Sequence, residues 1–116
     1  LTKRLLYKQK VAQLSSSVSR MFAAKIFNNA DEAVADIPHG ATIGFGGFGL
    51  CGLPENLIDA IAKKGLMDLT CVSNEAGVNG HGLDILVKNR QIKKLICSFV
   101  GNNHNFEEQY FNGDIE

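Results

Sequence analysis

The sequence contains few cysteines, and their arrangement excludes two classes of small protein. Cys51, Cys71 and Cys97 are an odd number and form no C-x-x-C pair. A disulfide scaffold and a zinc site are therefore both disfavoured, and a reducing intracellular compartment fits. Each of the three lies in an apolar run, where a free thiol behaves as a small hydrophobic residue, so we expect all three to be buried.

Acidic residues are absent from the first 30 positions, which hold six basic ones, whereas residues 31–116 hold six basic and twelve acidic residues. A basic leader that is free of acid and contains four serines is typical of a mitochondrial transit peptide. We assign residues 1–24 to this leader, with an uncertain cleavage point, and expect a mitochondrial matrix protein. The alternative is a solvated basic tail.

Long hydrophobic runs are also missing. Lys or Gln interrupts every apolar stretch of the leader, so a secretory signal peptide is not expected. The longest apolar runs are far below membrane-spanning length, and no membrane association is predicted. Internal repeats, heptads and low-complexity tracts are lacking as well. What remains, residues 25–116, is long and apolar enough for one small domain or part of one.

Helix-like and strand-like segments alternate along this domain. Short apolar runs predict buried strands over 41–45, 69–72 and 95–100. Between and around them, capping and turn residues predict helices that begin near Asn29, at Pro54 and near Leu83, and a last helix over 105–111. Phe106, Tyr110 and Phe111 fall at helical spacing in that last helix and are expected in the core. Strands that alternate with helices indicate an α/β fold with a mainly parallel sheet.

Three loops follow the predicted strands, over 46–54, 73–82 and 101–105. In open α/β sheets ligands bind beyond the carboxyl ends of the strands, so these loops are the expected walls of a site. Residues 44–49 match G-x-G-x-x-G, which could indicate a dinucleotide fold, but Pro54 delays the helix beyond the glycines that should begin it. His39, His81 and His104 show no metal spacing and are expected to be solvated.

A longer motif is more specific. The stretch GGFGLCGLPENLI at 46–58 resembles the first signature of family I coenzyme A transferases, G-G-F-x-x-x-G-x-P. The match extends to the ketoacid CoA-transferase subgroup through SNEAGV at 73–78, QIKK at 91–94, the V-G-x-N turn at 100–103 and F-E-x-Q-Y at 106–110. The resemblance covers about residues 25–116. With the leader in front, it points to the eukaryotic ketone-body members.

The resemblance implies the three-layer α/β architecture of that superfamily, of which this chain would be the opening, truncated part of the N-terminal domain. It implies transfer of CoA from succinyl-CoA to acetoacetate through a glutamyl-CoA thioester, with CoA as a substrate and no metal or redox cofactor. The partners it implies are a 3-oxoacid, the C-terminal half of the same enzyme and a second copy in a homodimer, and no nucleic acid.

Glycines let a backbone approach a ligand and present N–H groups to a carboxylate or an oxyanion. The expected substrate-binding residues are Gly46, Gly47, Phe48, Gly49, Gly52, Asn74 and Glu75. Glu75 stands in S-N-E-A-G, which departs from the S-E-N-G of the family's nucleophile segment. We therefore predict no catalytic nucleophile within these residues and read Glu75 as substrate-facing, as a supporting residue or as a plain loop carboxylate.

Two consequences follow for the chain by itself. It should lack transferase activity, because the nucleophilic glutamate is expected downstream. The alternative function is a non-catalytic, subunit-like or regulatory partner of a separate catalytic half.

Overall fold

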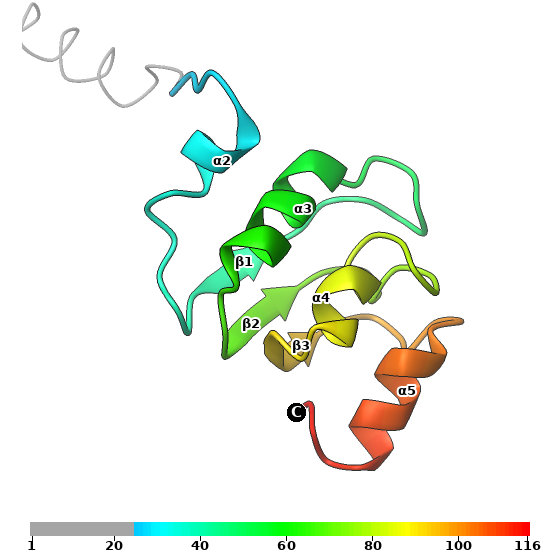
Figure 1. Ribbon diagram of the computed structural model, residues 1–116. Helices are drawn as coiled ribbons and strands as arrows, with labels where there is room; N and C mark the ends of the chain where they lie inside the picture. The colour runs from blue at the N-terminus through cyan, green and yellow to red at the C-terminus, as the bar shows by residue number, and fades with distance from the viewer. Residues whose placement is uncertain (1–24) are drawn as a thin grey trace, which may run out of the picture.

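The computed structural model describes residues 25–116, and the predicted leader lies outside them (Figure 1). Its centre is a sheet of three parallel strands in the order β1-β2-β3: β1 (Thr42–Gly44), β2 (Leu69–Val72) and β3 (Ile92–Ile96). Because each strand returns to the same end, the loops that follow the strands all lie at one edge of the sheet. The predicted parallel α/β fold is confirmed.

Within residues 25–116, four helices accompany the sheet: α2 (Ala30–Ala33), α3 (Glu55–Lys64), α4 (Asp84–Lys88) and α5 (His104–Phe111). Local chemistry sets their ends. The side chain of Asn29 accepts a hydrogen bond from Glu32 N at 2.8 Å and caps α2. Gly65 ends α3 in the left-handed conformation, with φ of 69°. The predicted starts near Asn29, Pro54 and Leu83 are correct within one or two residues.

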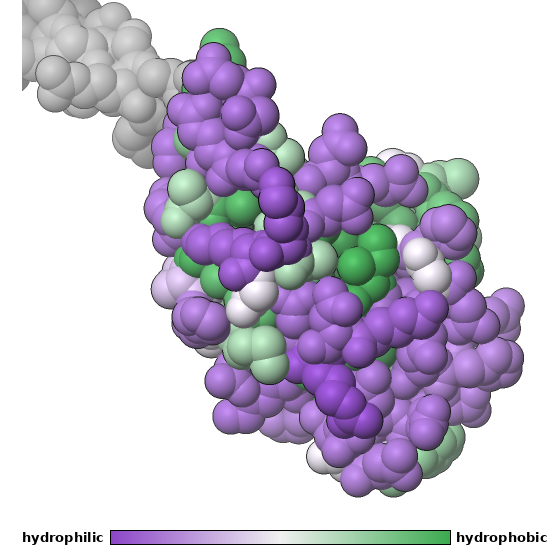
Figure 2. Space-filling view, viewed as in Figure 1, coloured by the Kyte–Doolittle hydropathy of each residue, from purple (hydrophilic) through white to green (hydrophobic). Residues whose placement is uncertain are grey.

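The core lies between the sheet and the helices on one of its faces (Figure 1). Ile58 and Ile61 of α3 and Leu69 and Cys71 of β2 belong to the same buried cluster. Exposure alternates along β2, since Leu69 and Cys71 are fully buried whereas Val72 is 39% exposed on the opposite face. The helix-covered side is largely hydrophilic on its outside (Figure 2). The other face of the sheet is not covered by any element of residues 25–116.

Three expectations about the elements were wrong. The third strand covers 92–96 rather than 95–100, because pairing with β2 begins at Ile92, and Phe99 and Val100 lie exposed beyond it. The first strand is an edge strand and is only partly buried. In α5, Phe106 is 3% exposed, but Tyr110 and Phe111 point outward and are 49% and 77% exposed. Helical spacing groups aromatic rings without saying which side faces the core.

The free edge of β3 is met by Glu116. Its N–H donates to Lys93 O and its carbonyl accepts from Leu95 N, each at 2.9 Å, which is the bonding pattern of a parallel strand pair. Lys94 Nζ lies 2.6 Å from Glu116 Oε1, and this hydrogen bond lowers the pKa of the Glu116 carboxyl. Within residues 25–116 the outer edge of β3 is therefore paired at this one position.

Candidate functional site at the strand ends

Three loops meet at the carboxyl end of the sheet, as the order of elements predicted. We call residues 46–54 loop 1, residues 73–82 loop 2 and residues 97–103 loop 3. Loops 1 and 2 each contain a tight turn closed by an antiparallel bridge, between Phe48 and Cys51 and between Val78 and His81. Loop 3 leads from β3 into α5.

The glycines of loop 1 differ in whether the fold requires glycine at their positions. Gly47 has φ of 115°, and a β-carbon there would lie 2.8 Å from Leu53 Cδ2, so only glycine fits. Gly49 and Gly52 also have positive φ. Gly46 has neither a positive φ nor an atom within 4 Å of a built β-carbon. Folding of the described residues therefore gives no reason for glycine at position 46.

Loop 1 contains backbone hydrogen-bond donors that have no acceptor within residues 25–116. Within residues 25–116, the N–H groups of Gly46, Gly47 and Gly49 donate to no backbone or side-chain acceptor. The first turn of α3 follows at Glu55, and Pro54 offers it no side-chain cap. Phe48 is 68% exposed beside these donors. Loop 1 thus combines free amides with an exposed aromatic ring and leads into a helix N-terminus.

Glu75 of loop 2 reaches between the other two loops. Its Oε1 lies 3.5 Å from the position of a β-carbon on Gly49, and its Oε2 lies 3.1 Å from that of a β-carbon on Gly101. The residue is only 9% exposed, yet its carboxylate makes no hydrogen bond and no ion pair with any other described residue. Its carboxylate oxygens still reach solvent, so they can accept a hydrogen bond from a ligand or from another part of the protein.

Asn74, the residue before Glu75, also has a side-chain oxygen without a hydrogen-bond partner. Its backbone carbonyl accepts from Ser98 N at 2.9 Å, and its Nδ2 lies 3.4 Å from Ser98 Oγ. The Oδ1 atom is buried and has no partner among residues 25–116. Loops 1 and 2 therefore bring the predicted residues to one edge of the sheet. Gly49 and Glu75 approach each other across the two loops, and Gly47 and Gly52 approach each other within loop 1.

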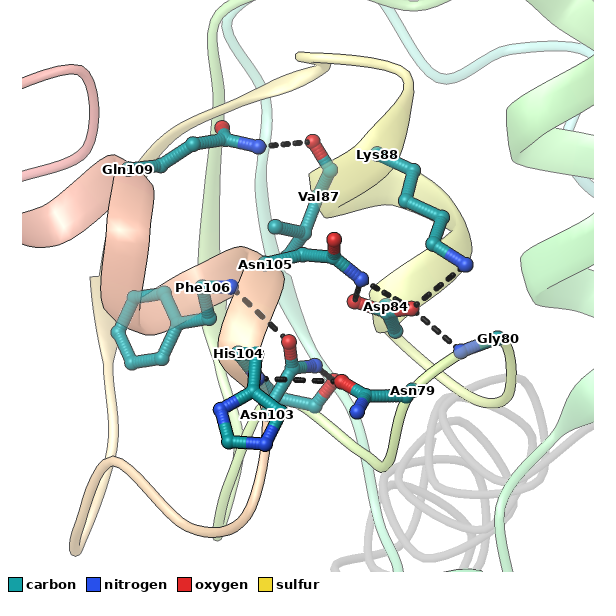
Figure 3. Close-up of polar contacts among 11 residues, drawn as sticks. Asn79, Gly80, Asp84, Val87, Lys88, Asn103, His104, Asn105, Phe106 and Gln109 are labelled. Atoms are coloured by element: carbon teal, nitrogen blue, oxygen red, sulfur yellow. Dashed lines mark hydrogen bonds and ion pairs between the residues drawn. The ribbon is translucent and has the colours of Figure 1, made fainter.

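A polar network joins loop 2 to α4, α5 and loop 3, and the sequence did not predict it (Figure 3). The Asp84 carboxylate is fully buried, accepts from Asn105 Nδ2 at 2.9 and 3.0 Å and from Gly80 N, and lies 3.5 Å from Lys88 Nζ. Asn79 Oδ1 accepts from His104 N at 3.1 Å. The aspartate in the first turn of α4 was the one visible signal.

Asn103 completes this network from the end of loop 3. It is 1% exposed, and its Oδ1 accepts from Phe106 N at 2.9 Å (Figure 3). Its Nδ2 donates to Ala76 O at 3.1 Å. An asparagine one residue before a helix is a recognisable capping signal. The second bond, across to loop 2, joins residues 27 apart and has no local signal.

The histidines and cysteines of residues 25–116 form no cluster at the strand ends. The three histidines are exposed, as expected. Cys71 is buried and Cys97 partly buried, but Cys51 is exposed, so the expectation of three buried thiols was wrong for Cys51, which the tight turn of loop 1 turns outward. Burial raises the pKa of Cys71 to about 12. Within residues 25–116 no group of three potential metal ligands comes together, and no helix is long and apolar enough to cross a bilayer.

The dinucleotide alternative finds no support in the geometry. In that motif the helix begins within the glycines, so that its N-terminus meets the pyrophosphate. Here the last motif glycine is Gly49 and α3 begins at Glu55, with the Phe48–Cys51 turn between.

Comparison with known proteins gives information on both the sequence family and the fold of this chain. A family model described as coenzyme A transferase matches residues 27–116. A Helicobacter pylori protein, named as one subunit of a succinyl-CoA:3-ketoacid coenzyme A transferase, is 52% identical over 92 residues, which are 79% of this chain and 40% of the relative. A human protein named succinyl-CoA:3-ketoacid coenzyme A transferase 2, mitochondrial, is 44% identical over 109 residues, covering 89% of this chain and 21% of the relative.

Among solved structures, a variant of the decarboxylase AibA/AibB superposes with a TM-score of 0.62 over 75% of this chain and 35% of that one. At 24% sequence identity this likeness concerns the fold alone. The chain thus spans less than half the length of these relatives.

Proposed function

This chain belongs to the coenzyme A transferase family, and from that premise we propose that, in the assembled enzyme, it takes part in transferring CoA from succinyl-CoA to acetoacetate. By the assembled enzyme we mean this chain together with the remainder that its curated relatives possess. The observation that carries the proposal is the match of residues 27–116 to the family, combined with relatives named as succinyl-CoA:3-ketoacid transferases.

The proposed reaction is ping-pong. A glutamate carboxylate attacks the thioester carbonyl of succinyl-CoA, expels the CoA thiolate and forms a mixed anhydride. The thiolate then attacks the glutamyl carbonyl of the anhydride, which releases succinate and leaves a glutamyl-CoA thioester. Acetoacetate reverses both steps and leaves as acetoacetyl-CoA. Covalent catalysis of this kind splits one difficult exchange into easier ones and needs no metal or redox cofactor.

Loop 1 is proposed to bind the acyl end of the substrates. Its free N–H groups and the N-terminus of α3 favour negative charge, such as a substrate carboxylate or the oxyanion of a tetrahedral intermediate. The open space at Gly46 is where a substrate can approach the backbone. Gly47, Gly49 and Gly52 then hold the turn that presents these donors.

Asn74 and Glu75 are proposed to face the substrates from loop 2. Both carry a polar group without a partner in the described part of the chain. Glu75 is not proposed as the nucleophile, because its surroundings in the sequence depart from the S-E-N-G segment. Borohydride reduction of the assembled enzyme after incubation with succinyl-CoA should modify another glutamate, and modification of Glu75 would overturn this assignment.

The substitution Gly46→Ala tests the site. It adds one methyl group to open space without backbone strain, so the melting temperature should stay within a few degrees, whereas kcat/KM should fall by about tenfold or more. Gly44→Ala is the matched control, since it also meets no atom within 4 Å but lies in β1 outside the loop. Unchanged kinetics of Gly46→Ala would contradict the placement of substrate at loop 1.

A subunit-like role is the second candidate, and the names of the bacterial relatives favour it. Each of them is named as one subunit of a transferase, and this chain covers about 40% of one of them. In that case the chain contributes loops to a site whose nucleophile comes from a separate polypeptide. We also propose that this chain associates with the C-terminal half of the enzyme and that the assembled enzyme is a homodimer. Light scattering of the mixed halves measures the mass of the complex and so tests both points.

We also propose the mitochondrial matrix as the location. The acid-free leader and the human relative named mitochondrial support it. Residues 1–30 fused to a fluorescent reporter should direct it to mitochondria, and a diffuse cytosolic signal would contradict the proposal.

A further inference from the structure

Glu75 owes its place to the backbone on either side of it. The carbonyl of the preceding residue, Asn74, accepts from Ser98 N at 2.9 Å. The carbonyl of the following residue, Ala76, accepts from Asn103 Nδ2 at 3.1 Å. Both donors belong to loop 3, so loop 2 is held to loop 3 immediately before and immediately after the carboxylate-bearing residue.

These two bonds differ in kind. The bond from Ser98 N is made by backbone atoms on both sides, so a substitution does not remove it directly. The bond from Asn103 depends on one side chain amide. That amide is fully packed, because Asn103 is 1% and Ala76 0% exposed. The opposite end of the same side chain caps α5 through Phe106 N, which fixes its orientation (Figure 3).

The space around Glu75 is narrow enough for a small displacement to matter. Its Oε2 lies 3.1 Å from the position of a β-carbon on Gly101, and its Oε1 lies 3.5 Å from that on Gly49. Gly101 is two residues before Asn103, so the same loop supplies both the anchor and one wall. If Ala76 lost its anchor, the carboxylate would lose its fixed distance to both glycines.

We propose that Asn103 is a positioning residue for the transferase reaction, which acts by holding the Glu75 carboxylate between loops 1 and 3. The proposal rests on the function proposed above, in which Glu75 faces the substrates. Asn103 itself touches no substrate. It has two separable tasks: its Oδ1 stabilises the start of α5, and its Nδ2 positions loop 2.

Asn103→Ser separates these tasks. Serine is a good helix cap and retains an acceptor for Phe106 N, but it offers no amide to Ala76 O. In the assembled enzyme we expect KM for succinyl-CoA to rise about fivefold or more, with a smaller change in the melting temperature than Asn103→Ala produces. Asn29→Ser is the matched control: Asn29 caps α2 through Glu32 N alone and lies away from the loops, so its kinetics should be unchanged.

A double-mutant cycle with Glu75→Gln decides whether Asn103 acts through Glu75. If it does, Asn103→Ser will change KM little once Glu75 is already replaced. If the two effects multiply independently, Asn103 is only structural and the inference is wrong, while the proposed role of Glu75 stands. If Glu75→Gln alone leaves KM and kcat unchanged, the substrate-facing role of Glu75 fails and the inference falls with it. Should Asn103→Ser not fold, Asn103→Asp, which keeps the volume and the cap but not the donor, takes its place in the cycle.

Discussion

At the scale of single residues, the position of a side chain in a strand or turn decides its solvent exposure and therefore its reactivity. Cys71 and Val72 are neighbours in β2, yet one is fully buried and the other 39% exposed, because successive side chains of a strand point to opposite faces. Cys51 is a third case: it closes the turn of loop 1 and is exposed. The three thiols of this chain should therefore differ widely in reactivity.

We predict that Cys51 reacts first and Cys71 last with a thiol reagent such as dithionitrobenzoate. Burial raises the pKa of Cys71 to about 12 and also blocks access, while Cys97 is half-buried and should be intermediate. Cys51→Ser should remove the fast phase, and all three thiols should react together in denaturant. Early labelling of Cys71 in the folded protein would contradict the burial of β2.

The same burial predicts a pH effect with a definite sign. The folded state holds the Cys71 thiol protonated to about pH 12, whereas the unfolded chain ionises near 9.0. Folding stability from this group is complete below pH 9 and is lost as the pH rises toward 12. Cys71→Ala should make the melting temperature less sensitive to pH in that window.

At the scale of elements, short helices are held by polar anchors rather than by their own propensity. The helix α4 has only five residues, too few to be stable alone. Asp84 at its start binds the Gly80 N–H of loop 2 and the Asn105 amide of α5 (Figure 3). One carboxylate thus connects two helices and a site loop, which is why its loss should affect all three.

We predict that Asp84→Ala lowers the free energy of unfolding by about 2–4 kcal/mol, because it leaves the amides of Gly80 and Asn105 without their acceptor and removes a buried charge partner. Lys88→Ala is the control: its side chain is 49% exposed, and the loss should stay below about 1 kcal/mol. Urea denaturation of both variants measures the difference. Equal losses would mean that the ion pair, rather than the amide bonds, holds α4.

At the scale of the whole molecule, the described residues form a parallel sheet with helices packed on one face. Helices cover one face of the parallel sheet, and the other face carries exposed side chains such as Val72 and Ile96, at 39% and 49% exposure. Parallel sheets are normally covered on both faces. The three loops likewise offer free N–H donors and a carboxylate that has no partner within residues 25–116.

The 116-residue chain by itself should therefore be inactive and prone to associate through the open face. The measurement is acetoacetyl-CoA formation from succinyl-CoA and acetoacetate, first with the chain and then after mixing with a C-terminal half from a relative. Turnover by the chain alone would defeat the prediction. Turnover only after mixing would support it and favour the subunit-like role. Ile96→Thr should reduce association, seen by light scattering, without restoring activity.

Much of the architecture was determined by local sequence. Alternating apolar runs and capping residues such as Asn29 and Gly65 set the order of helices and strands, because hydrophobic period, helix caps and turns depend on residues a few positions apart. The motif at 46–58 likewise pointed to the family that the comparison then confirmed. The predicted site residues at loops 1 and 2 stay a prediction, although they do lie at the expected edge of the sheet.

Only the tertiary structure decided which of these residues meet. The start of β3 at Ile92 follows from pairing with β2, and the exposure of Phe111 follows from how α5 lies on α4. Glu75 lies between Gly49 and Gly101, and Asn103 bonds Ala76, because parallel strands bring loops from distant sequence positions to one edge. Such contacts join residues 26 or 27 positions apart, and no local pattern encodes them.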